Sequence, residues 1–281
     1  VKICSDKNLP NQYALGRSSS SQNLKSFILH SHSKPIKNLK LYRGRLYLSD
    51  TSIGSCISYQ IDLTKSLVDD NKTVLIDNRD WLLYPKTTQQ VKVQFHFEDP
   101  EHKVSTPWPK SSSNGSNLVY ILPRYPKNQS SKTVFGKVHL ESINIKKAKL
   151  EIALIGTENK KRLNEYVKWI KDTADILDMY TGLFPQRPVQ IILAATGAQR
   201  EAVPWAEVQR GGGASVHFYV DEFSDINDFY QDWTAVHELS HLYLPNLQTE
   251  DLWLSEGLAT YYQVILRSKA KITTSSQGWQ K

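Results

Sequence analysis

Two patterns of hydrophobic and polar residues follow one another along the chain. In the first 148 residues, short segments rich in β-branched and aromatic residues alternate with polar positions or form brief apolar runs. These segments cover residues 39–49, 73–77, 91–97, 117–123 and 137–145. Clusters of Ser, Asn, Pro and Gly separate them. Alternation with period two, bounded by turn residues, is typical of strands. We therefore predict an antiparallel β-sandwich domain over residues 1–148.

After residue 148, apolar residues also recur at helical spacing. Three apolar runs predict buried strands, at residues 149–155, 189–195 and 214–220. Between the first two, apolar residues recur at helical spacing from Leu163 to Leu177, which predicts an amphipathic helix. Thr157 is the expected N-cap and Gly182 the expected C-terminal stop.

Two further helices are expected near the end of the chain. One covers residues 228–243 and is ended by Pro245, and the other covers residues 251–267. The chain as a whole therefore has an α+β pattern, with a β-rich domain over 1–148 and a mixed domain over 149–281.

The sequence His-Glu-Leu-Ser-His lies within the helix expected at 228–243. Its two histidines, His237 and His241, are one helical turn apart and share one face. Their imidazole nitrogens can converge on one tetrahedral zinc ion. Glu238 is close enough to take a proton from a metal-bound water. The alternative is a helix with two ordinary histidines.

A catalytic zinc ion needs a third protein ligand and one open position. Leu244 and Leu247 stand where the metzincin pattern requires glycine and histidine. Glu256, on the next expected helix, is the preferred third ligand. Glu250 and Asp251 are alternatives, although their place at a loop–helix junction suits a solvated cap better.

Residues 237–262 resemble the gluzincin peptidases of the aminopeptidase N type and the related glycyl aminopeptidases. The shared residues are His237, Glu238, His241, Asn246, Leu247, Asp251 to Leu254, Glu256, Gly257 and Ala259. The small residues Gly257 and Ala259 would allow two helices to approach closely. The β-rich first half also fits the N-terminal domain of that family.

The resemblance implies a zinc-dependent peptidase with a thermolysin-like catalytic lobe. His237, His241 and Glu256 would bind one Zn²⁺ per chain, Glu238 would be the general base, and a peptide would be the substrate. Thr260 falls where the family has a small hydroxyl residue, and it could support a ligand through a hydrogen bond.

The chain departs from the family in its substrate-binding strand. The family reads Gly-Ala-Met-Glu-Asn there, whereas the nearest match, residues 213–217, has Val216 in place of the glutamate that holds a free amine. Glu201 or Glu207 could replace that glutamate. The second departure is a loop shorter than that of the family, since only 14 residues separate His241 from Glu256.

The glycine run before this match has two interpretations. Gly211, Gly212, Gly213 and Ala214 could bind an extended peptide by strand addition, or the glycines could form a flexible turn.

A third departure concerns the family's oxyanion-stabilising tyrosine, which lies well beyond the glutamate ligand. Only 25 residues follow Glu256, and Tyr261 and Tyr262 on the ligand helix suit packing better. We therefore expect the C-terminal helical lobe to be absent from this chain and to be supplied in cis or as a separate chain. A catalytically degenerate peptidase fold that binds a peptide or protein is the alternative function.

Composition narrows the function classes only slightly. Hydrophobic residues make up 40% and charged residues 22% of the 281 residues, which excludes a disordered chain. The net charge of +7 is spread over both halves, so no nucleic-acid partner is expected. No apolar run is long enough to span a membrane. Cys4 and Cys56 could be free thiols or a disulfide, and a disulfide would favour a periplasmic or secreted protein.

Overall fold

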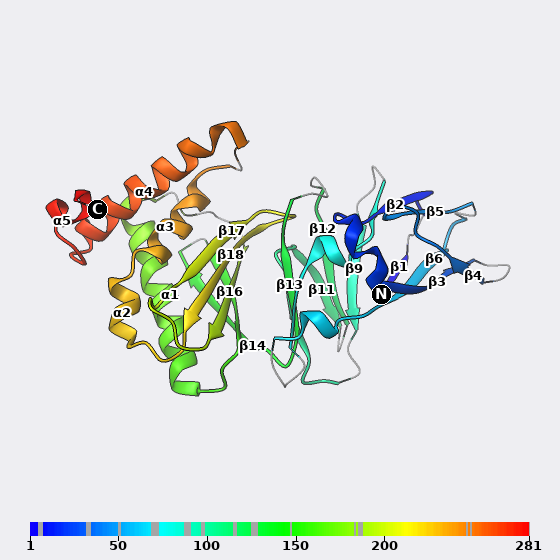
Figure 1. The fold of residues 1–281 in the computed structure, drawn as a ribbon, viewed down its shortest axis with the longest axis horizontal. Helices are drawn as coiled ribbons and strands as arrows, with labels where there is room; N and C mark the ends of the chain where they lie inside the picture. Colours follow the sequence, from blue (N-terminus) through cyan, green and yellow to red (C-terminus); the bar gives the residue numbers. More distant parts are fainter. Residues whose placement is uncertain are drawn as a thin grey trace. The chain divides into compact units, whose positions relative to one another are not determined.

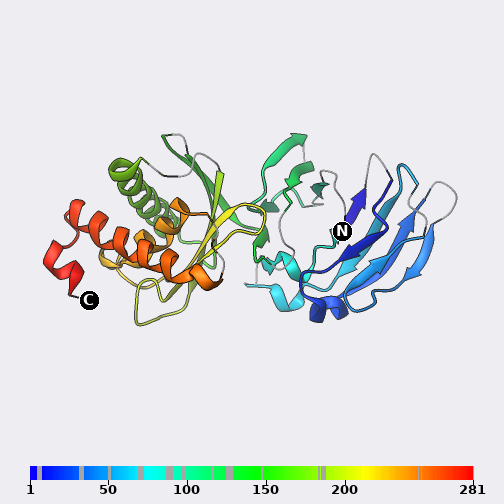
Figure 2. The ribbon, with the colours of Figure 1, turned by 90° about the horizontal axis from the view of Figure 1, so that it is seen from above.

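The structure is a computed structural model, and it forms two compact units, Val1–Lys137 and Val138–Lys281. It describes all residues except 5–7, 32–34, 50–51, 69–72, 87–90, 97–98, 115–116, 125–128, 147, 183, 185–187, 246, 248 and 281. Figure 1 and Figure 2 show the first unit in blue to green and the second in green to red. The division falls earlier than the boundary expected after residue 148, because the strand from His139 to Ile145 pairs with a strand of the second unit.

The first unit consists of four small sheets in which every described pairing is antiparallel. In sheet order, the first sheet contains β1 (Lys2–Cys4), β6 (Cys56–Ile61), β3 (Leu24–His30) and β4 (Ile36–Leu39), and the second contains β5 (Arg45–Tyr47), β2 (Gln12–Ala14) and β8 (Tyr84–Pro85). The third contains β10 (Lys103–Ser105), β13 (Lys132–Gly136) and β7 (Val74–Asp77). The fourth contains β11 (Lys110–Asn114), β12 (Asn117–Leu122) and β9 (Val91–His96). Three short 3₁₀ helices join them: η1 (Ser18–Asn23), η2 (Thr64–Ser66) and η3 (Asn78–Asp80).

Two hydrophobic cores hold these sheets together. The first two sheets share a core around Tyr13 and Tyr59. The other two share a core around Trp81 and Trp108. The antiparallel β character of the first half is therefore as expected, whereas the sandwich arrangement stays a prediction.

The strand expected over residues 39–49 is in fact two strand segments with a tight turn between them. Tyr42 and Arg45 exchange backbone hydrogen bonds of 2.8 and 3.0 Å. Arg43 and Gly44 between them have φ values of +50° and +71°. Positive φ at both central residues is the geometry of a type I′ turn, which a period-two pattern of side chains does not reveal.

The second unit is built on one five-stranded sheet. Its strands, in sheet order, are β14 (His139–Ile145), β15 (Ala148–Ile155), β16 (Pro188–Thr196), β18 (Ala214–Asp221) and β17 (Trp205–Gln209). The three inner strands are parallel to one another, and the two outer strands are antiparallel to their neighbours. The helices are α1 (Lys160–Thr181), α2 (Ile226–Gln231), α3 (Thr234–Ser240), η4 (His241–Tyr243), η5 (Thr249–Asp251), α4 (Leu252–Lys269) and α5 (Ser275–Trp279). Together with the first unit, they give the chain a mixed α+β fold.

Helix α1 packs on one face of this sheet through a buried aromatic cluster. The ring of Trp169 lies 5.6 Å from that of Phe218 on β18 and 5.2 Å from that of Phe229 on α2. The helix ends at Gly182 with φ +63°, as predicted. Its N-cap is Asn159 rather than Thr157, because the Asn159 side chain accepts the first free backbone N–H groups.

The helix expected at 228–243 is interrupted. Asp232 adopts an extended conformation between α2 and α3, with φ −69° and ψ 146°. Its carboxylate accepts a hydrogen bond of 2.7 Å from the backbone N–H of Thr234. The interruption therefore makes α3 a separate short helix, which carries the histidine motif. None of the helices in the described ranges combines the length and apolar character needed to cross a membrane.

Cys4 and Cys56 form a disulfide, which decides between the two alternatives left open by the sequence. The two residues are direct partners in the pairing of β1 with β6, and the bond closes a loop with a sequence separation of 52.

Replacing both cysteines by serine should lower the stability of the first unit by about 2–4 kcal/mol, because the unfolded chain regains the entropy of an open loop. Hydrogen exchange measured by mass spectrometry at increasing denaturant would test this, with peptides of the second unit as internal control. Equal loss of protection in both units would contradict a local effect of the disulfide.

Candidate metal centre

His237 and His241 keep the spacing of one helical turn although α3 ends between them. His241 is the C-cap of α3 with helical angles, φ −56° and ψ −25°, and its N–H donates to the carbonyl of His237. The two ring centroids lie 4.9 Å apart. Both residues are buried, each with 8% of its surface exposed. The motif therefore presents both imidazoles on one side of α3.

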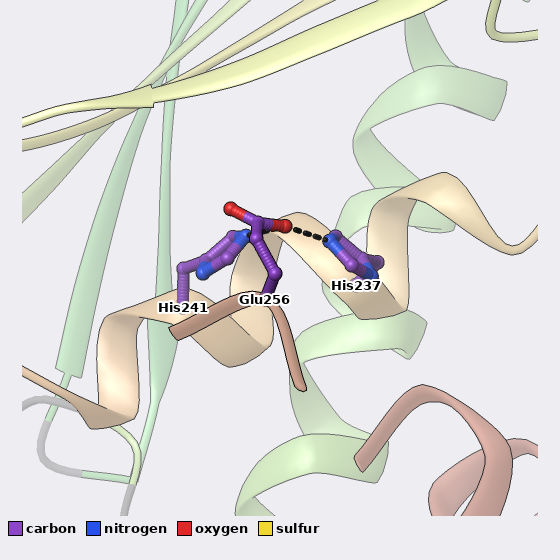
Figure 3. Close-up of side chains that lie close together, drawn as sticks. All are labelled: His237, His241 and Glu256. Atoms are coloured by element: carbon purple, nitrogen blue, oxygen red, sulfur yellow. Dashed lines mark hydrogen bonds and ion pairs between the residues drawn. The ribbon is translucent and has the colours of Figure 1, made fainter. Parts of the chain in front are cut away.

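The carboxylate of Glu256 on α4 completes a cluster with the two imidazoles (Figure 3). Its Oε2 lies 3.2 Å from Nε2 of His237 and 3.6 Å from Nε2 of His241. The three candidate ligand atoms lie within 4.8 Å of one another. Tetrahedral zinc bonds of about 2.0–2.1 Å place neighbouring ligand atoms about 3.3–3.4 Å apart. The donor set therefore has the chemistry of a zinc site, and the two distances from Glu256 are close to this spacing.

The alternative ligands do not belong to this cluster. Glu250 and Asp251 lie in η5, before the start of α4, and among the described residues the cluster contains only the two histidines and Glu256. Asn246, one of the residues shared with the aminopeptidase families, lies outside the described residues.

Of the two small residues that follow Glu256, Ala259 is buried and Gly257 is exposed. Ala259 is 1% exposed, whereas a Cβ added at Gly257 would meet no atom within 4 Å. The expectation that both small residues serve helix packing is therefore wrong for Gly257, because it lies on the open side of α4.

The outer nitrogens of both imidazoles have partners on α4. Nδ1 of His237 lies 3.0 Å from Oε1 of Gln263, and Nδ1 of His241 lies 3.0 Å from Oγ of Ser255. Because an amide oxygen only accepts, this contact puts a proton on Nδ1 of His237. Nε2 faces the Glu256 carboxylate, and a metal ion or a second proton between these two atoms would satisfy both. Such contacts fix the orientation of a metal-binding imidazole.

Thr260 was the residue expected to give this support. It is exposed on α4, and no hydrogen bond joins it to His237 or His241 in the described part of the chain. The sequence does contain a signal for Gln263, because it follows Glu256 by seven residues, or two helical turns. Ser255 stands directly before Glu256 and carried no comparable signal.

Burial and neighbouring charges shift the pKa values of Glu238 and His241 in opposite directions. Burial, together with the charges of Glu256 and Glu207, raises the pKa of Glu238 to about 7. Burial also lowers the pKa of His241, a shift that the Glu256 charge opposes and His237 and Arg210 reinforce. A neutral imidazole is the form that binds a metal. A carboxylate with a pKa near neutrality suits proton transfer at physiological pH.

The glycine run forms a turn, the second of the two interpretations. Gly211, Gly212 and Gly213 connect β17 to β18, and Gly212 has φ +89°. Ala214 begins β18, which pairs with β16 on one side and β17 on the other. From Ser215 onward both edges of β18 are paired, so strand addition is blocked there, whereas peptide binding at Ala214 stays a prediction.

The outer edge at this side of the sheet belongs to β17, a strand that sequence reasoning missed. Trp205 is exposed, the next three residues are partly buried and only Gln209 is buried, so the segment lacks the apolar run that identified the inner strands. Glu207 lies on β17 and acts electrostatically on Glu238. Glu201 precedes the strand and is exposed.

The two tyrosines of the ligand helix make ring contacts. Tyr262 packs against Tyr243 at 5.0 Å between centroids, and Tyr261 lies 6.3 Å from Trp279 on α5.

Comparison with known proteins finds a solved structure with a similar fold. No protein-family model matches it, and no curated protein matches it. Among solved structures it is similar to an aminopeptidase N family protein from Idiomarina loihiensis, with 17% sequence identity and a TM-score of 0.63. The similarity covers 99% of this chain and 53% of that protein, so the chain spans about half of its length. At this level of identity the comparison shows a shared fold.

Proposed function

We propose that the chain is the catalytic part of a zinc-dependent peptidase of the aminopeptidase type. His237, His241 and Glu256 would hold the zinc ion, and Glu238 would be the general base. The observation that carries the proposal is the convergence of two imidazoles and one carboxylate, whose donor atoms lie within 4.8 Å of one another. The fold shared with an aminopeptidase N family protein supports it.

Two imidazoles and one carboxylate form a ligand set that leaves one position of a catalytic zinc ion open. When bound, zinc supplies a Lewis acid for the scissile carbonyl and lowers the pKa of a water molecule. The side chain of Glu256 is 59% exposed, so the cluster has a side that a substrate can reach. Glu238 would take the proton of the attacking water and pass it to the leaving amine.

The substrate would lie along β17. An extended peptide can add to the outer edge of this strand through backbone hydrogen bonds. Glu207 on the same strand would attract the free ammonium group of a peptide and so favour cleavage next to the N-terminus. Glu207 would thus take the place of the glutamate that is missing at Val216.

A further helical lobe is proposed to cover α4, either in the same chain or as a separate chain. Exposed apolar side chains mark this surface: Leu252 is 46%, Trp253 71% and Leu254 38% exposed. The disulfide between Cys4 and Cys56 supports a periplasmic or secreted location, because such bonds persist in oxidising compartments.

The chain should bind zinc with a stoichiometry of about one equivalent, because the cluster offers a single set of three ligands. His237→Ala and Glu256→Ala should each weaken binding more than about 100-fold. Titration against a chelator of known affinity measures this. His30→Ala, at a histidine that bonds Ser58 in the first unit, is the control. Unchanged affinity in both site variants would refute the ligand assignment.

Gln263→Ala should weaken zinc binding about 10–100-fold, because His237 loses the partner that fixes its tautomer and ring orientation. Thr260→Ala, on the exposed surface of the same helix, should leave the affinity unchanged. The same chelator titration compares the two. A loss at Thr260 without a loss at Gln263 would restore the assignment made from the family resemblance.

Glu238→Gln should keep the zinc and lower peptide hydrolysis by about 10²–10⁴-fold, because the amide cannot accept the proton of water. Elemental analysis and a peptide-cleavage assay of the full-length protein measure the two effects. A parent protein that binds zinc and peptides without cleaving them would instead favour the degenerate binding module.

A further inference from the structure

A row of polar side chains runs from β16 over β18 to β17 in the sheet of the second unit and ends at Glu207. Oγ of Ser215 lies 2.7 Å from Oε1 of Gln190 and 2.7 Å from Nε2 of His217. Nδ1 of His217 lies 3.4 Å from Oε1 of Glu207. Gln190, Ser215 and His217 are no more than 2% exposed. Nothing in the zinc mechanism uses these buried groups.

Strand register brings the last two members together. His217 on β18 and Glu207 on β17 are direct partners in the antiparallel pairing, so their side chains lie on the same face of the sheet. The side chain of His217 is 2% exposed and that of Glu207 is 31% exposed. The contact therefore links a fully buried imidazole to a carboxylate at the rim of the proposed peptide site.

The donors and acceptors along this row fix the position of one proton on His217. The amide oxygen of Gln190 only accepts, so the single hydroxyl hydrogen of Ser215 is donated to it. Toward His217, Ser215 can then only accept, which requires a proton on Nε2. In a neutral imidazole, Nδ1 would then carry a lone pair directed at the carboxylate of Glu207.

Two acceptors facing each other in a buried contact repel, and a second proton between them removes the conflict. Imidazole is intrinsically more basic than a glutamate carboxylate, so this proton belongs on Nδ1. The result is a buried imidazolium paired with a carboxylate, which satisfies both charges.

We propose that His217 is a positioning residue, which holds the Glu207 carboxylate through a protonated Nδ1 in the orientation that receives a substrate ammonium group beside Glu238. The part of this inference that concerns the substrate rests on the proposed peptidase function, whereas the protonated pair does not.

Two substitutions separate the two contacts of the imidazole. His217→Asn places an amide nitrogen near the position of Nδ1 and can still donate to Glu207. His217→Gln reaches toward the position of Nε2, so it keeps the contact with Ser215 and loses the donor to Glu207. Circular dichroism and hydrogen exchange check that both variants fold.

The proton arrangement is tested on the metal-free chain by ¹⁵N NMR with labelled histidine at neutral pH. Of the eight histidines, the one whose signals vanish in His217→Gln should carry protons on both ring nitrogens. It should revert to a single proton on Nε2 in Glu207→Gln. A singly protonated His217 in the parent chain would overturn the proposal.

The positioning role is tested on the full-length protein with a peptide that has a free N-terminus and with its acetylated form. His217→Gln should raise KM for the free peptide about tenfold, as expected for the loss of one charged hydrogen bond, with kcat changed less than about threefold. His217→Asn should restore KM, and neither variant should affect the acetylated peptide. Equal effects of Asn and Gln, or of both peptides, would overturn the positioning role.

If the parent protein cleaves no peptide, the proposed function fails and the substrate part of this inference fails with it. The NMR experiment still decides whether His217 and Glu207 share the second proton, because it needs neither zinc nor turnover.

Discussion

The candidate site depends on the packing of α3 against α4, which brings one carboxylate to two imidazoles. Neither helix forms the cluster alone, because α3 and its C-cap supply His237 and His241 while α4 supplies Glu256. The same contact supplies Gln263 and Ser255, which bind the outer nitrogens of the two rings. A single interface thus sets both the ligands and their orientation.

The five-stranded sheet supplies the other half of the arrangement. Its inner parallel strands contribute to the core around Trp169. Its outer strand β17 has no strand partner on its far side among the described residues. The charges of Glu207 on that strand and of Glu256 on α4 both raise the pKa of Glu238. The hydrogen-bonded chain through Ser215 and His217 connects the sheet interior to this carboxylate. In this way the buried interior of the sheet is linked to the proposed peptide-binding edge.

Sequence reasoning located most regular elements because their signals are local. The apolar run of residues 189–195 and the helical period from Leu163 to Leu177 each correspond to an observed element. It failed where a single residue changes the backbone direction, as at Asp232, or where a turn lies inside an alternating segment, as at Gly44. It also missed β17, because an edge strand buries too little of its surface to show an apolar pattern.

The sequence by itself determined the identity of the two histidines, the adjacent glutamate and the preferred third ligand. Helical spacing and side-chain chemistry are local properties, so they can be recognised from residues close together in the chain. Only the tertiary structure decided which side chains support them. Gln263 rather than Thr260 meets His237, and Glu207 meets His217, because these contacts depend on how helices and strands distant in sequence pack together. It also assigned the open sheet edge to β17 and the glycines to a turn, since strand pairing is a property of the whole sheet.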